Sequence, residues 1–372
     1  MVEWVERKIS DIGTVVGGAT PSTKKPENYE DGKIAWITPK DLSTFSGRYI
    51  ERGERNITEI GLKSCSTQLL PPNTVLFSSR APIGYVAIAA NEVCTNQGFK
   101  SVIPNENTDP LFLFYLLKYN KDKIEGMGSG TTFKEVSGNT MKNIVVNVPT
   151  DKKVQKKIAT ILSSIDDKIE ENVQINDNLE QQAQAIFDNM FPNISNGENT
   201  IGDIITPKRG KGLLSKNAVF GNVPVVAGGL EPSTYHNTAN TVAPVLAISA
   251  SGANAGFVSL WNTPIWSSDS SFIDSSMTDY VYFWYILLKK RQREIYDSQT
   301  GSAQPHIYPQ HISAMPISDL NFDDIRNYTS IVTPIFEMIG HNKDENARLA
   351  TTRDTLLPKL MSGELDVSNI EV

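Results

Sequence analysis

The chain has 372 residues, which is long for a single domain and fits two to four folded units. Its hydrophobic content of 39% and charged content of 21% fit a soluble globular protein, and no apolar run is long enough to span a bilayer. The formal net charge of −7 argues against a protein that binds nucleic acid alone through a basic surface, although local basic patches or a partner subunit can supply such contacts.

Residues 1–150 are predicted to form a first mixed α/β globular domain. Its opening residues, MVEWVERKIS, lack the apolar segment of a secretory signal, and its cysteines, Cys65 and Cys94, lack CxxC spacing, so we expect a cytoplasmic protein with two buried thiols. Runs such as IAWITPKDL and TVLFSSRAPIGYVAIAA predict short strands. LFLFYLLKYNKDKI predicts an amphipathic helix that starts after Asp109, a good N-cap residue.

Residues 151–191 are predicted to form one long helix. Apolar or small residues recur at alternating steps of four and three, the spacing of a coiled-coil seam, and Asn172 and Asn176 interrupt the middle of that seam. The helix also carries the acidic cluster Asp166, Asp167, Glu170 and Glu171. We interpret this cluster as a solvated helix face rather than as acid–base catalysts.

Residues 192–321 are predicted to form a second mixed domain after a polar linker rich in Asn, Gly and Pro. PVLAISASGANAGFVSL predicts strands, and YVYFWYILLKKRQREI predicts a helix that starts after Asp279. The basic run at the end of that helix fits a DNA-backbone contact and a solvated face equally well; it comprises Lys289, Lys290, Arg291 and Arg293.

Residues 322–372 contain a second long helix that repeats the first without a gap. At a constant offset of 170, Ile165 falls on Ile335 and Asn172 on Asn342. The preceding domains repeat more weakly, with GTTFKEVSGNTMKNIVV (130–146) matching GSAQPHIYPQHISAMPI (301–317) and SSRAPIGYVAI (78–88) matching SASGANAGFVSL (249–260). Repetition on this scale predicts two copies of one structural unit.

The polar interruptions at matching places in both helices favour helices that pack on each other over two helices that lie on separate cores. The short linker between the copies then favours an antiparallel pair. The fold class is therefore α+β: two mixed α/β domains, each followed by a long helix, with the helices packed as an antiparallel coiled coil with pseudo-twofold symmetry. Asn172 and Asn342 are predicted to fix the register and to meet near the axis. Such a pair would hold the domains at a fixed spacing, as proteins do that read two DNA half-sites about 34 Å apart.

A resemblance to the specificity subunits of type I restriction–modification systems is carried by GTTFKEVS at 130–137, by the helix DKKVQKKIATILSSIDDKIEENVQINDNLEQQ at 151–182, and by LLPKLMSGEL at 356–365. The resemblance covers nearly the whole chain. It implies two target recognition domains, each of which reads one half of a bipartite asymmetric site on double-stranded DNA. It also implies that the helices dock two modification (adenine-N6 methyltransferase) subunits, which restriction/translocase subunits join.

We expect no active site in the chain itself. It has no GxxxxGK[ST] phosphate loop, no NPPY-type tetrapeptide of adenine methyltransferases and no GxGxxG before a helix. His306 and His311 lie five apart without the HExxH context of a zinc site, so no metal is predicted. S-adenosylmethionine, ATP and Mg²⁺ are expected only on the partner subunits.

Candidate DNA contacts are polar or basic residues in predicted loops, because Arg, Lys, Asn and Gln read base edges and Lys and loop groups hold phosphates. In the first domain they are Thr38, Lys40, Ser79, Arg80, Asn96, Gln97, Lys100, Thr131, Thr132 and Lys134. In the second domain they are Lys208, Arg209, Lys211, Ser251, Asn254, Ser267, Ser268, Asp269, Gln304 and His306.

Two other functions fit the same sequence. One is a helical scaffold whose globular ends bind proteins; the basic segments KRGK and KKRQR argue mildly for DNA instead, and a steep salt dependence of binding would separate the two. The other is the DNA-reading arm of a fused nuclease–methylase enzyme, which neighbouring genes would distinguish.

Overall fold

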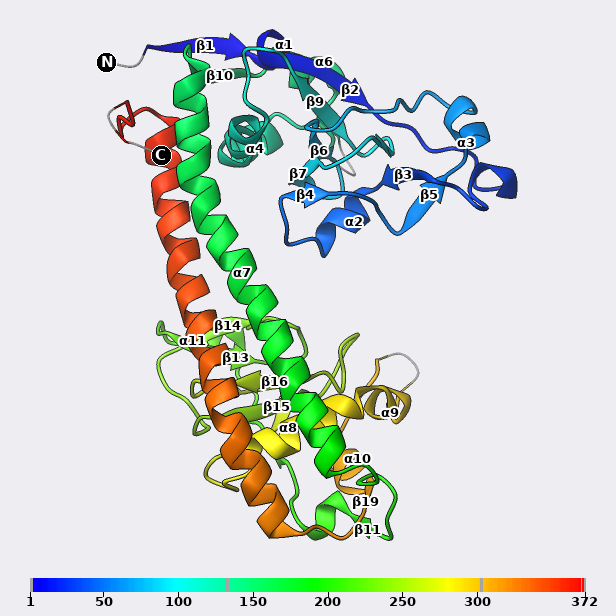
Figure 1. The fold of residues 1–372 in the computed structure, drawn as a ribbon, viewed down its shortest axis with the longest axis vertical. Helices are drawn as coiled ribbons and strands as arrows, with labels where there is room; N and C mark the ends of the chain where they lie inside the picture. The colour runs from blue at the N-terminus through cyan, green and yellow to red at the C-terminus, as the bar shows by residue number, and fades with distance from the viewer. Residues whose placement is uncertain (1–2, 131–133, 302–303, 369, 371–372) are drawn as a thin grey trace. The chain divides into compact units, whose positions relative to one another are not determined.

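The computed structural model describes residues 3–130, 134–301, 304–368 and 370, and it divides into two compact units (Figure 1). Unit 1 comprises residues 1–170 and 347–372, and unit 2 comprises residues 171–346. The two long helices, α7 (Lys152–Met190) and α11 (Phe322–Met361), each contribute to both units. The predicted fold class, mixed α/β domains that are each followed by a long helix, is confirmed.

The globular part of unit 1 is mostly β-structure. Its strands are β1 (Trp4–Lys8), β2 (Gly13–Gly17), β3 (Ile34–Ile37), β4 (Tyr49–Ile50), β5 (Arg55–Ile57), β6 (Val75–Ser79), β7 (Ile83–Ala89), β8 (Val93–Thr95), β9 (Lys100–Pro104) and β10 (Val145–Pro149). Its helices are α1 (Ile9–Ile12), α2 (Pro39–Ser43), α3 (Glu59–Lys63), α4 (Pro110–Tyr119), α5 (Lys121–Gly126) and α6 (Gly138–Asn143), with a 3-10 turn η1 (Pro26–Asn28). The strands form a sheet of order β2-β9-β6-β7-β4, a sheet of order β5-β3-β8 and the pair β1-β10.

Helix α4 begins where the sequence predicts. The Asp109 side chain accepts hydrogen bonds from the backbone N–H groups of Leu111 and Phe112, both at 3.0 Å, and so satisfies two donors of the first turn. The helix buries its apolar side chains in one core with Ile158 and Leu162 of α7. The globular part is thereby attached to the beginning of α7.

The segment that follows α11 completes the same core. Val367 is buried, and the Lys157 ammonium of α7 donates a hydrogen bond of 2.7 Å to the carbonyl of Ser368. Gly363 has a φ of 77° and lies against the Trp4 indole, where a Cβ would approach Nε1 to 2.6 Å. Unit 1 is therefore built from both early and late parts of the chain.

The globular part of unit 2 has fewer and shorter strands. They are β11 (Asn199–Thr200), β12 (Lys208–Arg209), β13 (Val223–Val226), β14 (Thr234–His236), β15 (Val245–Ser249), β16 (Val258–Trp261), β17 (Trp266–Ser267), β18 (Ser270–Asp274) and β19 (Pro316–Ile317). Its helices are α8 (Val281–Lys290), α9 (Gln292–Asp297) and α10 (Pro309–Ser313), with 3-10 turns η2 (Ile201–Asp203) and η3 (Ser215–Asn217). The sheets have the orders β12-β18-β15-β16, β14-β13-β17 and β11-β19.

Helix α8 starts one residue later than predicted. Tyr280 occupies the N-cap position, and its backbone N–H donates to the Thr278 hydroxyl at 3.1 Å, so the prediction that Asp279 caps this helix is wrong. The helix is held instead by packing. Phe283 lies 5.5 Å from the Phe187 ring of α7, and Phe187 lies 5.4 Å from the Tyr328 ring of α11.

Within unit 2 the two long helices run antiparallel. The Asn172 amide donates to Asn346 at 2.9 Å, and the Asn342 amide donates to Asn176 at 2.8 Å, so a step of four residues forward on α7 is a step of four backward on α11. Asn172 is only 1% exposed and donates a second bond to Glu345 at 2.7 Å. Asn172 and Asn342 thus bond to Asn346 and Asn176 of the facing helix, two contacts that the repeat relates, and their role in fixing the register stays a prediction.

The internal repeat is visible in the backbone of both globular parts. Gly84 and Gly256, which the sequence repeat aligns, both have left-handed φ values, of 100° and 89°. Gly130 and Gly301, also aligned, have φ values of 134° and 95°. The equivalent glycines therefore make equivalent turns, as two copies of one structural unit require.

The two cysteines differ in their surroundings. Cys94 is buried as predicted, and burial raises the pKa of its thiol to about 11, whereas Cys65 is only partly buried. Across the described residues, no helix has the length and apolar character needed to cross a membrane.

Candidate nucleic-acid interface

Two predicted contact residues of unit 1 converge on one carboxylate, and a third, Ser79, lies beside them. Arg80 follows β6 and Lys100 begins β9; their side chains reach Glu135 at 3.7 and 3.3 Å. The Lys100 ammonium also lies 3.4 Å from the Ser79 hydroxyl. Glu135 was not among the predicted contacts, because its role depends on long-range pairing of its loop with the end of β6.

The other predicted contacts of the first domain lie in neighbouring turns. The Asn96 side chain accepts a hydrogen bond of 2.8 Å from the backbone N–H of Gly98, and a Cβ at Gly98 would approach Pro39 to 2.7 Å, so the turn of Asn96 and Gln97 lies against the start of α2. At that start the Thr38 hydroxyl bonds to Asp41 at 2.6 Å as part of a capping box. Thr38 therefore has a structural partner already.

Lysines 40 and 134 are exposed, which suits contact with phosphates. Lys40 pairs with Glu54 at 2.8 Å in a fully exposed ion pair, and Lys134 is exposed beside Glu135. Thr131 and Thr132 lie outside the described residues, so their predicted role stays a prediction.

In unit 2 an equivalent cluster forms around Asp269. Arg209 of β12 pairs with Asp269 at 2.6 Å, and the Ser251 hydroxyl donates to the same carboxylate. Ser251 forms an isolated β-bridge with His306. Predicted contacts from three separate stretches of sequence are thus brought together.

Two predicted contacts of unit 2 face inward. Ser267 is fully buried and shares a hydrogen bond of 2.7 Å with the Ser270 hydroxyl. Ser268 is buried and accepts a hydrogen bond of 2.9 Å from the backbone N–H of Leu213. These hydroxyls hold the loop that carries Asp269 and do not face solvent.

The remaining predicted contacts of unit 2 surround this loop. Lys208, Lys211 and Gln304 are exposed, and Asn254 is partly buried in the turn after Ser251. The His306 ring stacks on the exposed ring of Tyr308, with centroids 5.9 Å apart. Tyr308, which was not predicted, adds a flat aromatic surface beside the cluster.

The two clusters occupy equivalent places in their units. Arg80 forms a β-bridge with Glu135, as Ser251 does with His306. The backbone N–H of Val136 bonds to the carbonyl of Ser79 at 3.0 Å, and that of Ile307 bonds to the carbonyl of Ala250 at 2.9 Å, which is the same contact one repeat later. The same backbone arrangement, which we call the frame, is repeated in both units, whereas the side chains that it presents differ.

The basic run at the end of α8 is partly structural. Arg291 is 6% exposed, bonds to Glu294 at 2.6 Å and donates to the carbonyl of Pro316 at 2.6 Å. Lys290 pairs with Asp188 of α7, and the exposed Arg293 pairs with Asp297 within α9. Arg291 therefore points into the unit and is not placed to contact a DNA backbone, while the choice between the two roles stays open for the other three basic residues.

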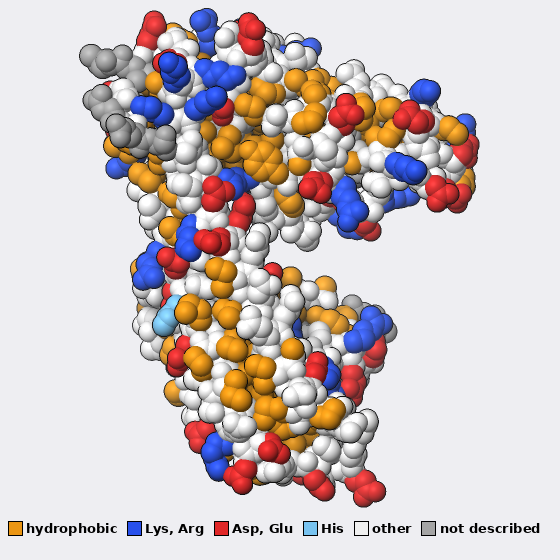
Figure 2. All heavy atoms as spheres, viewed as in Figure 1, with side chains coloured by type: hydrophobic (Ala, Val, Ile, Leu, Met, Phe, Trp, Pro, Cys, Tyr) orange, Lys and Arg blue, Asp and Glu red, His pale blue; other side chains and the backbone are white. Residues whose placement is uncertain are grey.

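The charged side chains on the surface are of mixed sign. On the face drawn in Figure 2, acidic and basic side chains are interspersed over both units. Within the described part of the chain, no group of three or more His, Cys, Asp or Glu side chains is placed to hold a metal ion.

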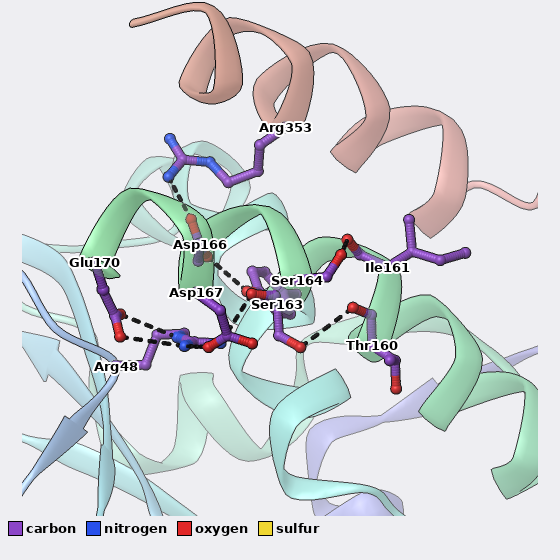
Figure 3. A network of polar contacts seen from close by, with 10 residues as sticks. Arg48, Thr160, Ile161, Ser163, Ser164, Asp166, Asp167, Glu170 and Arg353 are labelled. Carbon is purple, nitrogen blue, oxygen red and sulfur yellow. Dashed lines mark hydrogen bonds and ion pairs between the residues drawn. The ribbon is translucent and has the colours of Figure 1, made fainter. Parts of the chain in front are cut away.

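The acidic cluster on α7 is only in part the solvated face that the sequence suggested: Asp167 and Glu171 are exposed, whereas Asp166 is buried (Figure 3). Asp166 is 6% exposed; it accepts a hydrogen bond of 2.6 Å from the Tyr115 hydroxyl and pairs with Arg353 of α11 at 2.7 Å. The interpretation was wrong for Asp166 because its charged partner lies 187 residues away in sequence. Asp167 and Glu170 bind a further partner, Arg48.

Arg48 is a buried cation held by this cluster. Its guanidinium pairs with Asp167, and its Nε lies 3.2 Å from a Glu170 carboxylate oxygen. Burial lowers the pKa of Arg48, but the hydrogen bonds to Glu170 and Asp167 outweigh it, so the pKa lies above its ordinary value. Arg48 is therefore always charged, and the sequence offered no signal for it.

Comparison with known proteins decides the family. Residues 1–181 match the family described as the type I restriction modification DNA specificity domain. The specificity subunit of the type I restriction enzyme MjaIX from Methanocaldococcus jannaschii is 34% identical over an alignment 413 positions long, gaps included, which covers 99% of this chain and 95% of that protein. The chain belongs to the specificity subunits of type I restriction–modification systems.

More distant relatives of this specificity subunit agree with that assignment. A putative type I specificity subunit from Mycoplasma pneumoniae is 25% identical over 309 residues, covering 77% of this chain and 82% of that one. The crystal structure of the type I S subunit from M. genitalium superposes with a TM-score of 0.60 at 20% identity, over 96% of both chains, and so shares the fold.

Proposed function

We propose that this specificity subunit reads a bipartite, asymmetric site on double-stranded DNA, with residues 1–150 contacting one half-site and residues 192–321 the other. The observation that carries the proposal is the equivalence of the two loop clusters. The Arg80–Glu135 bridge and the Ser251–His306 bridge occupy the same place in two copies of one frame. Because the presented side chains differ, the two half-sites should differ in sequence.

The long helices serve as the spacer and as the docking surface for partners. Residues 151–191 and 322–372 would bind two methyltransferase subunits, and restriction/translocase subunits would join that complex. In this proposal S-adenosylmethionine, ATP and Mg²⁺ belong to the partners, and this chain supplies no catalytic group. The mixed surface charge supports a complex in which the partner subunits contribute much of the affinity for DNA.

The test is base-resolution mapping of adenine methylation in a methylation-free host that expresses the chain with its genomic methyltransferase partner. Methylation at one two-part asymmetric motif, lost when this chain is omitted, is the expected result. Exchange of residues 1–150 for those of another specificity subunit should then alter one half of the motif and leave the other half unchanged. Absence of any motif, with the partner soluble and bound, would contradict DNA reading and favour a scaffold that binds proteins.

A further inference from the structure

The first recognition domain is attached to α7 at two places of different chemistry. Near the start of α7, Ile158 and Leu162 lie in the apolar core with α4. Further along, Arg48 reaches α7 over Asp167 and Glu170, and its guanidinium also lies 3.4 Å from the carbonyl of Ser163 (Figure 3).

The contact that Arg48 makes with α7 restricts the orientation of the domain on the helix. Arg48 stands immediately before β4, which pairs with β7 at the edge of the five-stranded sheet, so a rigid element carries the guanidinium. Its side chain is 8% exposed, and a planar guanidinium that bridges two carboxylates has few alternative geometries. An apolar contact alone is non-directional and would let the domain rock on the helix.

Unit 2 has a different contact at the equivalent place. Asn262, just after β16, donates a hydrogen bond of 2.6 Å to the carbonyl of Phe336 on α11. A Cβ at Gly340 would overlap the Asn262 amide, so a glycine is needed for this approach. By the offset of 170, Phe336 and Gly340 correspond to Asp166 and Glu170. Each domain therefore sends one polar side chain to the same turn of the helix that follows it.

We propose that Arg48 is a positioning residue that fixes the tilt of the first recognition domain on α7, and that Asn262 on Gly340 plays the same part in the second domain. Since the tilt of a domain on its helix, together with the length of the helices, sets where its half-site must lie, Arg48 then narrows the range of spacer lengths that the complex accepts. The inference rests on the proposed reading of a bipartite site. Neither residue needs to touch DNA.

The first experiment measures spacer length in the complex with the methyltransferase partner. Oligonucleotides carry the two half-sites with the cognate spacer or with spacers one base pair longer or shorter. Arg48→Ala should lower the preference for the cognate spacer by about tenfold, while both half-site sequences stay the same. Arg48→Lys, which keeps the charge but lacks the planar guanidinium with its fixed donor geometry, should fall between Arg48→Ala and wild type.

Matched variants separate positioning from a general loss of stability. Arg52→Ala removes an exposed arginine of the same domain and should leave spacer preference unchanged. Asp167→Asn combined with Glu170→Gln removes the partners of Arg48 and should reproduce the Arg48→Ala result. A uniform fall in methylation at all spacers, with the preference retained, would overturn the proposal and leave Arg48 a stabilising residue only.

A second experiment needs no DNA, so it can fail independently of the proposed function. Spin labels at Lys63→Cys in α3 and Lys153→Cys in α7, in the full chain with Cys65→Ser, report the distance between the domain and its helix by pulsed electron resonance. Arg48→Ala should broaden the distance distribution, and Arg52→Ala should not. An unchanged distribution in Arg48→Ala would contradict positioning even if bipartite methylation is observed; a missing motif in wild type would instead contradict the proposed function.

Discussion

The Tyr115 hydroxyl donates a hydrogen bond of 2.6 Å to the carboxylate of Asp166, and Arg353 binds the other oxygen of that carboxylate at 2.7 Å. One buried acid thus joins α4, α7 and α11 in unit 1. One repeat along, Asp166 and Arg353 are replaced by Phe336 and Ala183, both buried in the apolar core of unit 2. The two copies make the same helix contact, one with an ion pair and one with apolar packing.

The first prediction concerns the buried ion pair between Asp166 and Arg353. Arg353→Met alone should destabilise the chain by about 2–3 kcal/mol, because it leaves the buried Asp166 carboxylate without its cationic partner. Asp166→Leu with Arg353→Met should cost less than that single change, because apolar replacement of both partners is often neutral. Urea unfolding of the four members of the double-mutant cycle measures this coupling. The exposed pair Asp323–Arg326 on α11 is the control and should couple by less than about 1 kcal/mol. Equal coupling in both cycles would be inconsistent with a buried pair.

The second prediction is a loss of stability at high pH. Burial, aided by the hydrogen bond to Asp166, raises the pKa of Tyr115 above its ordinary value, and burial with Glu180 does the same for Tyr285. Their contribution is fully present below pH about 10, where unfolded tyrosine is still protonated, and it falls by about 1.4 kcal/mol per pH unit per residue above that value. Tyr115→Phe should make the decline above pH 10 shallower by one such slope, measured by urea unfolding at a series of pH values. Tyr119→Phe, at an exposed position of the same helix, should leave the slope unchanged.

The third prediction addresses the asparagines between the long helices. The Asn172–Asn346 and Asn176–Asn342 hydrogen bonds are related by the repeat, so alanine cycles on the two pairs should give similar coupling, about 0.5–1.5 kcal/mol each. The control cycle pairs Asn172 with the exposed Thr351 and should be additive. Additive results for both asparagine pairs would remove their role in fixing the register.

The fourth prediction tests whether Arg209, in the cluster around Asp269, contacts a DNA phosphate and not a base. Arg209 is exposed beside Lys208, and in the complex we expect it to leave Asp269 for a phosphate. Arg209→Ala should weaken binding at all sequences and reduce the slope of log K against log salt concentration by about one. Arg326→Ala on α11 is the matched control. If both variants change the slope equally, Arg209 makes no specific contact.

Periodicity predicted what is local or repeated along the chain. The seam spacing and the offset of 170 predicted both long helices, and the Asp109 cap lies within three residues of the donors that it binds. The Asp279 cap failed because Tyr280 takes the N-cap position and its backbone N–H donates to the Thr278 hydroxyl.

The predictions that failed concern residues whose partners lie far away in the sequence. The pattern around Asp166 looks like a charged helix face until Arg353 and Tyr115 are brought beside it. Glu135 and Arg48 gave no signal for the same reason: each acquires its role from residues that the fold places against it, 35 to 122 positions away.

The division of the chain between the units also sets the order in which the units can fold during synthesis. Unit 2 is continuous, from residue 171 to residue 346, so all of its contacts can form once that stretch has left the ribosome. Unit 1 needs Val367 and the last turns of α11 in its core, so the domain made first must wait, incomplete, for the segment made after residue 346. We therefore expect a released chain that ends at residue 346 to protect unit 2 from protease and to leave unit 1 unprotected.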